Sequence, residues 1–115
     1  MTLREARCRY SHALALLVVY AYEIGLEVAF DEVIDRVTEK DPTTDHMKGS
    51  LHEVGLAADL LLYKDNRYCT DTSDYTVLGE HWEQMGKALD LELMWGGRFT
   101  KRDGNHFSLK WQGKA

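Results

Sequence analysis

Two histidines and one aspartate are the side chains in this sequence best suited to hold a catalytic metal. His52 and Asp59 lie seven positions apart, and His106 comes near the C-terminus, just before an alternating segment. Catalytic zinc is usually held by three such residues, which leave a fourth position open for water. The three residues therefore form a candidate zinc site. From spacing alone, a hydrogen-bonded histidine and an aspartate that caps a turn are the simpler explanations.

The elements that must position these residues follow from hydrophobic periodicity. Apolar residues recur at spacings of three and four over residues 3–24 and again over about 74–89, which predicts two amphipathic helices. Short apolar or alternating runs predict four strands. One charged segment has helical propensity, and a loop with a glycine pair precedes the last strand. The predicted strands are 26–30, 56–63, 66–69 and 107–111; the charged segment is 31–40, and the loops are 41–50 and 94–100.

Asp59 is predicted to share one strand face with Ala57, whose small side chain leaves room for a metal beside the carboxylate. Helices and strands are mixed without regular βαβ units, which favours an α+β fold with a small antiparallel sheet flanked by helices. With 115 residues, 44% of them apolar, and a single proline, the chain has the size and composition of one folded domain, residues 1–115.

Composition also excludes some classes of function. The formal net charge is -5 and no basic block is visible, so we expect no nucleic-acid partner. The apolar run at residues 13–22 is too short to span a bilayer and is followed by Glu23. We interpret it as part of a buried helix, with a signal peptide as the alternative, and expect no stable membrane insertion. Cys8 and Cys69 are predicted to be two thiols, with a disulfide as the open alternative.

Two motifs carry a resemblance to a known family. Residues 50–59 match S-x-H-x-x-G-x-A-x-D at all five fixed positions, and Asp103 and His106 form a later D-x-x-H. Together they resemble the zinc D-alanyl-D-alanine carboxypeptidases and L-alanyl-D-glutamate peptidases. The sequence is most similar to the single-domain phage endolysins of that family, which often carry Trp-Gly-Gly before the second motif, as Trp95 and the next two residues do here.

The resemblance implies a role for each matched residue. His52, Asp59 and His106 would bind zinc, and Asp103 would act as the general base. Arg36 falls where the family has an arginine that contacts the substrate or the developing oxyanion. The residues around Arg36 depart from the family pattern, because Asp precedes it and Val follows it. The implied fold is that of the hedgehog and DD-peptidase domains.

Three further residues are predicted to support the site or border the substrate cleft. Ser50 is expected to hold the His52 loop by hydrogen bonding. His46 lies in the preceding loop, and loops often carry functional side chains. Trp95 is expected to border the cleft.

The resemblance predicts a zinc-dependent peptidase that acts on the peptidoglycan stem peptide, at the L-alanyl-D-glutamate bond. The expected setting is that of a monomeric endolysin, made in the host cytoplasm without a signal peptide and released to the cell wall. One alternative is a D-alanyl-D-alanine carboxypeptidase of wall remodelling. A second alternative, of a different class, is a zinc-binding module that has lost catalysis.

Overall fold

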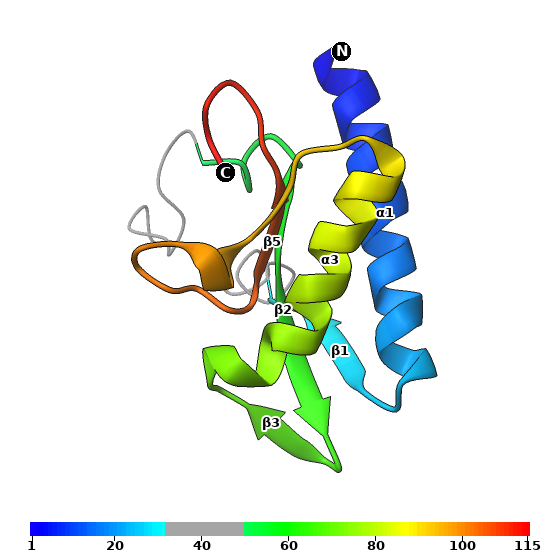
Figure 1. The fold of residues 1–115 in the computed structure, drawn as a ribbon, viewed down its shortest axis with the longest axis vertical. Helices are drawn as coiled ribbons and strands as arrows, with labels where there is room; N and C mark the ends of the chain where they lie inside the picture. Colours follow the sequence, from blue (N-terminus) through cyan, green and yellow to red (C-terminus); the bar gives the residue numbers. More distant parts are fainter. Residues whose placement is uncertain (32–49) are drawn as a thin grey trace, which may run out of the picture.

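The computed structural model describes residues 1–31 and 50–115, in which two long helices pack against an antiparallel sheet (Figure 1). The helices are α1 (Leu3–Glu23) and α3 (Thr76–Leu89), with short 3-10 helices η1 (Thr72–Tyr75) and η2 (Gly96–Arg98). The strands are β1 (Glu27–Phe30), β2 (Ala57–Lys64), β3 (Arg67–Cys69), β4 (Leu93–Trp95) and β5 (His106–Leu109). This architecture confirms the predicted α+β class with a small antiparallel sheet.

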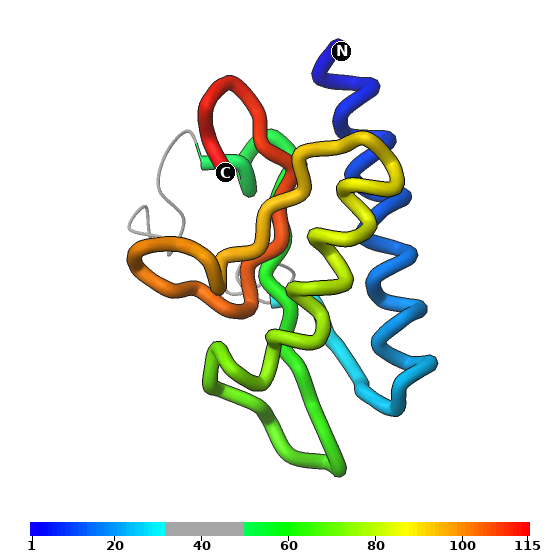
Figure 2. The backbone as a smooth tube through the Cα atoms, in the orientation of Figure 1, coloured from blue at the N-terminus to red at the C-terminus, as the bar shows by residue number. Residues whose placement is uncertain are grey.

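The strand β2 is the longest in the sheet and organises it. The strand order is β1-β2-β5-β4, with β3 paired to β2 as a hairpin, and every pairing is antiparallel. Figure 2 shows the chain returning late, so that β5 enters between β2 and β4. In this register Asp59 of β2 lies directly opposite His106 of β5.

Strand alternation divides the side chains of β2 and β5 between two faces of the sheet. Because cross-strand partners share a face, Ala58 and Phe107 lie together on one side, and Asp59 and His106 lie together on the other. Phe107 faces the helices and packs edge-on against Trp82 of α3, with ring centroids 6.0 Å apart. The face that carries Asp59 is therefore turned away from the helical layer.

The helical layer is fixed by a few specific contacts. Thr2 and Glu5 cap the start of α1 by exchanging side-chain and backbone hydrogen bonds, each 3.1 Å long. Tyr10 donates a 2.8 Å hydrogen bond from its hydroxyl to the Phe107 carbonyl, which ties α1 to β5. His81 of α3 stacks flat on Tyr20 of α1 at 3.6 Å. Burial in this stack lowers the pKa of His81.

Among the described residues, most of the predicted elements are confirmed within one or two residues, but the region after residue 92 differs. The predicted charged segment 31–40 and the predicted loop 41–50 lie outside the described residues, apart from Asp31 and Ser50. Residues 94–100 were predicted to be a loop, whereas Leu93–Trp95 forms β4 on the outer edge of β5. A strand of three residues is too short for alternation to reveal, and only its partner strand defines it. The last strand begins at His106 and ends at Leu109, so it includes the histidine that was placed just before it.

Two smaller predictions concern the cysteines and the membrane. Cys8 and Cys69 are both free thiols, as expected. Within residues 1–31 and 50–115, the helices include none with the length and apolarity needed to cross a bilayer.

The packing of α3 against β4 gives a prediction about Gly79. A Cβ atom at this position would overlap the ring of Trp95. In an ordinary helix interior, alanine is more favourable than glycine by about 1 kcal/mol. We expect Gly79→Ala to lower the free energy of unfolding instead, by about 1–3 kcal/mol, because the crowded ring must shift. Urea unfolding measures the change.

The matched control is Glu80→Ala, one residue along the same helix at an exposed position, which is expected to change stability by no more than about 0.5 kcal/mol. A Gly79→Ala protein that is more stable than the unmodified one would contradict the close packing of α3 on Trp95.

Candidate metal centre

A compact turn before β2 presents His52. The Ser50 carbonyl accepts a hydrogen bond from the Glu53 amide at 3.1 Å, and the Leu51 carbonyl accepts one from the Leu56 amide at 2.9 Å. Gly55 ends the turn with φ +77°, a left-handed conformation that glycine adopts without strain. Arg7 of α1 donates a 2.7 Å hydrogen bond to the Val54 carbonyl and anchors the turn from outside.

His52, Asp59 and His106 converge on the face of the sheet turned away from the helices. Asp59 Oδ1 lies 3.6 Å from His52 Nε2 and 3.5 Å from His106 Nδ1. One ligand atom of each of the three residues lies within 4.8 Å of the others, and their side chains are largely buried. The structure thus brings together the three residues that the sequence analysis grouped.

The spacing of these atoms fits a zinc ion. Separations of 3.5 and 3.6 Å are longer than a good hydrogen bond. Two ligands at about 2.1 Å from a tetrahedral zinc are about 3.4 Å apart, close to both values. Two imidazoles and one carboxylate are also a donor set typical of catalytic zinc. His52, Asp59 and His106 are therefore the residues that would hold the metal.

Asp103 lies beside this centre on the loop that leads into β5. Its Oδ2 is 4.0 Å from His106 Nδ1, and its side chain is 52% exposed. The Asp103 amide donates to the Gly96 carbonyl at 3.0 Å, and the Asp103 carbonyl accepts from the His106 amide at 3.1 Å. The carboxylate is thus close to the donor set while it remains open to solvent and to a substrate.

The loop at residues 96–105 is held from beneath by Trp95. Its indole Nε1 donates a 2.7 Å hydrogen bond to the Gly104 carbonyl, one residue after Asp103. Gly96 packs so closely on the loop that an added Cβ would overlap the Asp103 carbonyl. Arg98 lies 5.0 Å from the Trp95 ring and pairs with Glu83 of α3 through two hydrogen bonds of 3.0 and 3.1 Å. These contacts fix the position of Asp103 relative to α3.

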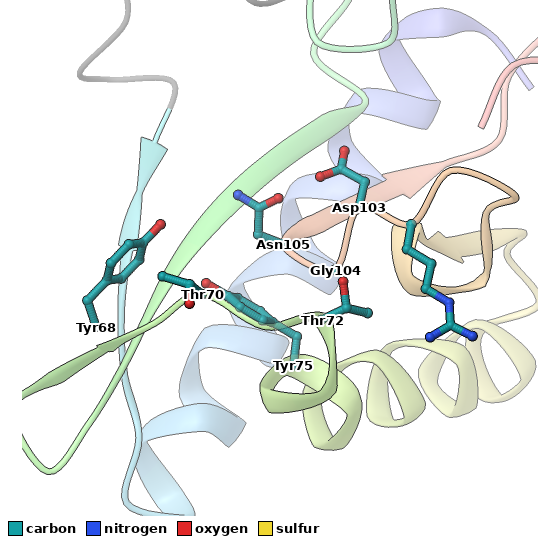
Figure 3. Close-up of a pocket in the computed structure, with 8 residues that line it drawn as sticks. Tyr68, Thr70, Thr72, Tyr75, Asp103, Gly104 and Asn105 are labelled. Carbon is teal, nitrogen blue, oxygen red and sulfur yellow. The ribbon is translucent and has the colours of Figure 1, made fainter.

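Two hollows lie near the donor set. One of about 400 Å³ is lined by His52 together with groups of α1, β1 and the start of β2, such as Leu14, Phe30 and Ala57, so it extends toward the helical layer. The other, of about 200 Å³, borders Asp103 and is lined mainly by polar groups (Figure 3). A substrate that extends from the centre past Asp103 would therefore meet polar groups.

Comparison with known families shows to which family the chain belongs. The sequence profile described as D-alanyl-D-alanine carboxypeptidase matches residues 44–109, more than half of the chain. The chain belongs to the D-alanyl-D-alanine carboxypeptidase family. All four residues of the site, from His52 to His106, lie inside the matched region.

The fold of this family member is also seen in a solved structure. The crystal structure of Serratia marcescens L-Ala D-Glu endopeptidase ChiX superposes with a TM-score of 0.66 at 18% sequence identity. The match covers 94% of this chain and 83% of that one, and at this identity it establishes the shared fold. A comparison with curated protein sequences finds no match.

Three further residues were predicted to belong to the site of this family member: Arg36, His46 and Ser50. Arg36 and His46 lie outside the residues that the structure describes. Ser50 contacts the His52 turn through its backbone carbonyl, whereas its buried Oγ has no hydrogen-bond partner in the described part of the chain. Ser50 thus hydrogen-bonds to the turn that carries His52 through its backbone, and a role for its side chain stays a prediction.

Trp95 was expected to border the substrate cleft, and the structure corrects this. Its side chain is only 3% exposed and lies against Gly79 of α3. The reason is strand alternation: Trp95 pairs with Phe107 in β5 and so faces the helices, on the side opposite His106. Trp95 contributes to the site by supporting the loop that carries Asp103.

Sequence reasoning missed the residues of the polar hollow beside Asp103. They come from β3, η1 and the loop before β5, and include Tyr68, Thr70, Thr72, Arg102 and Asn105. No local motif links these positions, because only the packing of η1 against the loop brings them together. In the sequence, the one indication of a polar site here was that Arg102 lies next to Asp103.

The geometry of the donor set predicts zinc binding by this family member. We expect one zinc per chain, held by His52, Asp59 and His106. His106→Ala removes one of three ligands and should weaken zinc binding by more than about 100-fold, beyond the loss typical of a supporting partner. Metal analysis and titration with a zinc indicator measure this.

The matched control is His12→Ala, which removes an exposed histidine of α1 and should leave zinc binding unchanged. Purified protein without stoichiometric zinc, or a His106→Ala variant with undiminished affinity, would contradict the assigned centre.

Proposed function

We propose that this protein is a zinc-dependent peptidase of the peptidoglycan stem peptide that cleaves the L-alanyl-D-glutamate bond. The observation that carries the proposal is the convergence of three zinc-type ligands with a fourth group, the carboxylate of Asp103, which lies beside the three but outside them. His52 and His106 lie 3.6 and 3.5 Å from Asp59 Oδ1, and Asp103 Oδ2 lies 4.0 Å from His106 Nδ1. A site for metal storage or structure alone has no need of the exposed fourth group.

Each residue has a part in the proposed hydrolysis. When bound, zinc supplies a Lewis acid that activates water for attack on the peptide carbonyl. Asp103 accepts a proton from the attacking water and transfers it to the leaving amine, so that one carboxylate acts first as base and then as acid. Because the Asp103 carboxylate is exposed, it can reach both the attacking water and the leaving amine. The contacts of Trp95 and Gly96 hold the backbone around Asp103 in place.

Two findings support a cell-wall substrate. The family profile is described as D-alanyl-D-alanine carboxypeptidase, and the similar solved structure is an L-Ala D-Glu endopeptidase. We favour the endopeptidase reaction because the similar solved structure is an endopeptidase, and because the polar hollow beside Asp103 gives room for a chain that continues past the cleaved bond. The endolysin setting inferred from the sequence stays a prediction.

A D-alanyl-D-alanine carboxypeptidase is the second candidate, and the description of the matching family favours it. Digestion of purified peptidoglycan with mass analysis of the fragments separates the two reactions. We expect new L-alanine carboxyl ends together with new D-glutamate amines. Release of free D-alanine alone would assign the carboxypeptidase reaction. A zinc-loaded protein that releases neither product would refute the proposal and favour a non-catalytic zinc-binding module.

The variant Asp103→Asn separates catalysis from metal binding. It keeps the size of the side chain but removes its capacity to accept a proton. We expect it to retain zinc and the fold, while kcat falls by roughly two to four orders of magnitude, the usual contribution of general acid–base catalysis. Zinc content, circular dichroism and kcat on peptidoglycan fragments provide the three measurements.

The contrast with His106→Ala makes this test specific, because that variant should lose zinc and activity together. If Asp103 were only a turn residue before Gly104, asparagine would serve equally well, since it is as common in such turns. A folded, zinc-loaded Asp103→Asn protein with nearly normal kcat would sink the assigned mechanism and leave the metal centre standing.

A further inference from the structure

The polar hollow beside Asp103 has a volume of about 200 Å³ and is built from three separate segments. Tyr68 and Thr70 come from β3 and the residue after it, Thr72 comes from η1, and Arg102 and Asn105 come from the loop before β5. Figure 3 shows Tyr68 on one side of this hollow and Asp103 on the other, with Thr70, Tyr75 and Asn105 between them.

Several hydrogen-bond donors of this hollow have no protein partner. Within residues 1–31 and 50–115, the side chains of Arg102, Asn105, Thr70 and Tyr68 make no hydrogen bond or ion pair. Tyr75 differs, because its hydroxyl donates to the Cys69 carbonyl at 3.0 Å and accepts from the Leu62 amide at 3.1 Å. Tyr75 is therefore a fixed wall, and the other four groups are available to a ligand.

The available groups are suited to an anion. Arg102 is an exposed guanidinium that can bind a carboxylate through two parallel hydrogen bonds. The amide and the two hydroxyls are further hydrogen-bond donors in the lining of the same hollow. The other hollow, which His52 lines together with residues of α1, offers mainly apolar contacts and has no lysine or arginine among its lining groups. Of the two hollows, the one beside Asp103 is therefore the one suited to a charged group.

The position of Asp103 indicates which end of the substrate enters the polar hollow. In the proposed reaction this carboxylate transfers its proton to the leaving amine, so the residue that carries the amine must lie next to it. Asp103 also lines the polar hollow. Groups attached to the leaving amine therefore extend toward Arg102.

We propose that this hollow is a specificity site for a carboxylate on the carbon that bears the leaving amine, with Arg102 as the residue that recognises it. The proposal rests on the proposed peptidase function and adds a charge preference to it. In the stem peptide, D-glutamate is linked through its side-chain carboxyl, so its α-carboxylate is free beside the amine. A terminal D-alanine presents the same group in the same place, so both candidate substrates satisfy this requirement.

The charge of that carboxylate gives a direct test. The first substrate pair is L-alanyl-γ-D-glutamyl-L-lysine and the same peptide with the glutamate α-carboxylate converted to an amide. The second pair is a peptide ending in D-alanyl-D-alanine and its C-terminal amide, which distinguishes the two sources of the carboxylate. We expect kcat/KM to favour the carboxylate form of the cleaved pair by at least about tenfold, the contribution of one charge-assisted hydrogen bond.

Three variants assign the preference to a residue. Arg102→Gln should reduce the carboxylate-to-amide ratio of kcat/KM to near one, and Arg102→Lys should restore part of it because the positive charge returns. Lys101→Gln removes the neighbouring exposed charge, which does not line the hollow, and should keep the full ratio. Zinc content is measured for each variant, because a merely structural effect would change both substrates alike and leave the ratio intact.

The outcomes separate this inference from the proposed function. A ratio near one in the unmodified protein, or a ratio that survives Arg102→Gln, would overturn the role of Arg102 while leaving the peptidase activity established. If the zinc-loaded protein hydrolyses neither pair, the proposed function fails. Calorimetric titration with γ-D-glutamyl-L-lysine and its α-amide then decides the inference: equal affinity for both would overturn it, and a preference for the carboxylate that Arg102→Gln abolishes would support it.

Discussion

The pairing of β5 with β2 is the constraint on which the candidate centre depends. The antiparallel register sets Asp59 opposite His106, so two of the three candidate ligands are cross-strand neighbours although they are 47 positions apart in the chain. A shift of one residue in this register would turn His106 toward the helices and separate the pair. The backbone hydrogen bonds of the sheet therefore hold two of the three candidate ligands in place, and only His52 comes from a turn outside the sheet.

The helical layer supports the candidate centre by hydrogen bonds to β4 and β5. Tyr10 of α1 bonds to the Phe107 carbonyl, and Trp82 of α3 donates from its indole to the carbonyls of Met94 and Ser108, at 3.0 and 3.2 Å. These bonds hold β4 and β5 from the side opposite Asp59. The buried face of the sheet therefore supports the open face, and the candidate ligands need few contacts among themselves to stay in place.

The loop between β4 and β5 meets a different requirement, because a residue proposed to act as general base needs a fixed backbone and a side chain that can still reach the substrate. Trp95 and Gly96 fix the backbone around Asp103 by one hydrogen bond and one close contact, while the carboxylate itself is half exposed. The same loop carries Arg102 into the polar hollow. Proton transfer and recognition of the leaving group are thus attributed to neighbouring positions of one supported loop.

The sequence by itself determined the α+β class, most element boundaries and the grouping of His52, Asp59 and His106, because periodicity and short motifs are local properties of the chain. Only the tertiary structure decided what depends on contacts between distant segments. The short strand β4 exists through its pairing with β5, and that pairing turned Trp95 from an expected cleft residue into a buried support. The polar hollow also depends on contacts between distant segments. Thr70, Thr72 and Arg102 share no pattern in the sequence, and they line one hollow only because η1 packs against the loop that precedes β5.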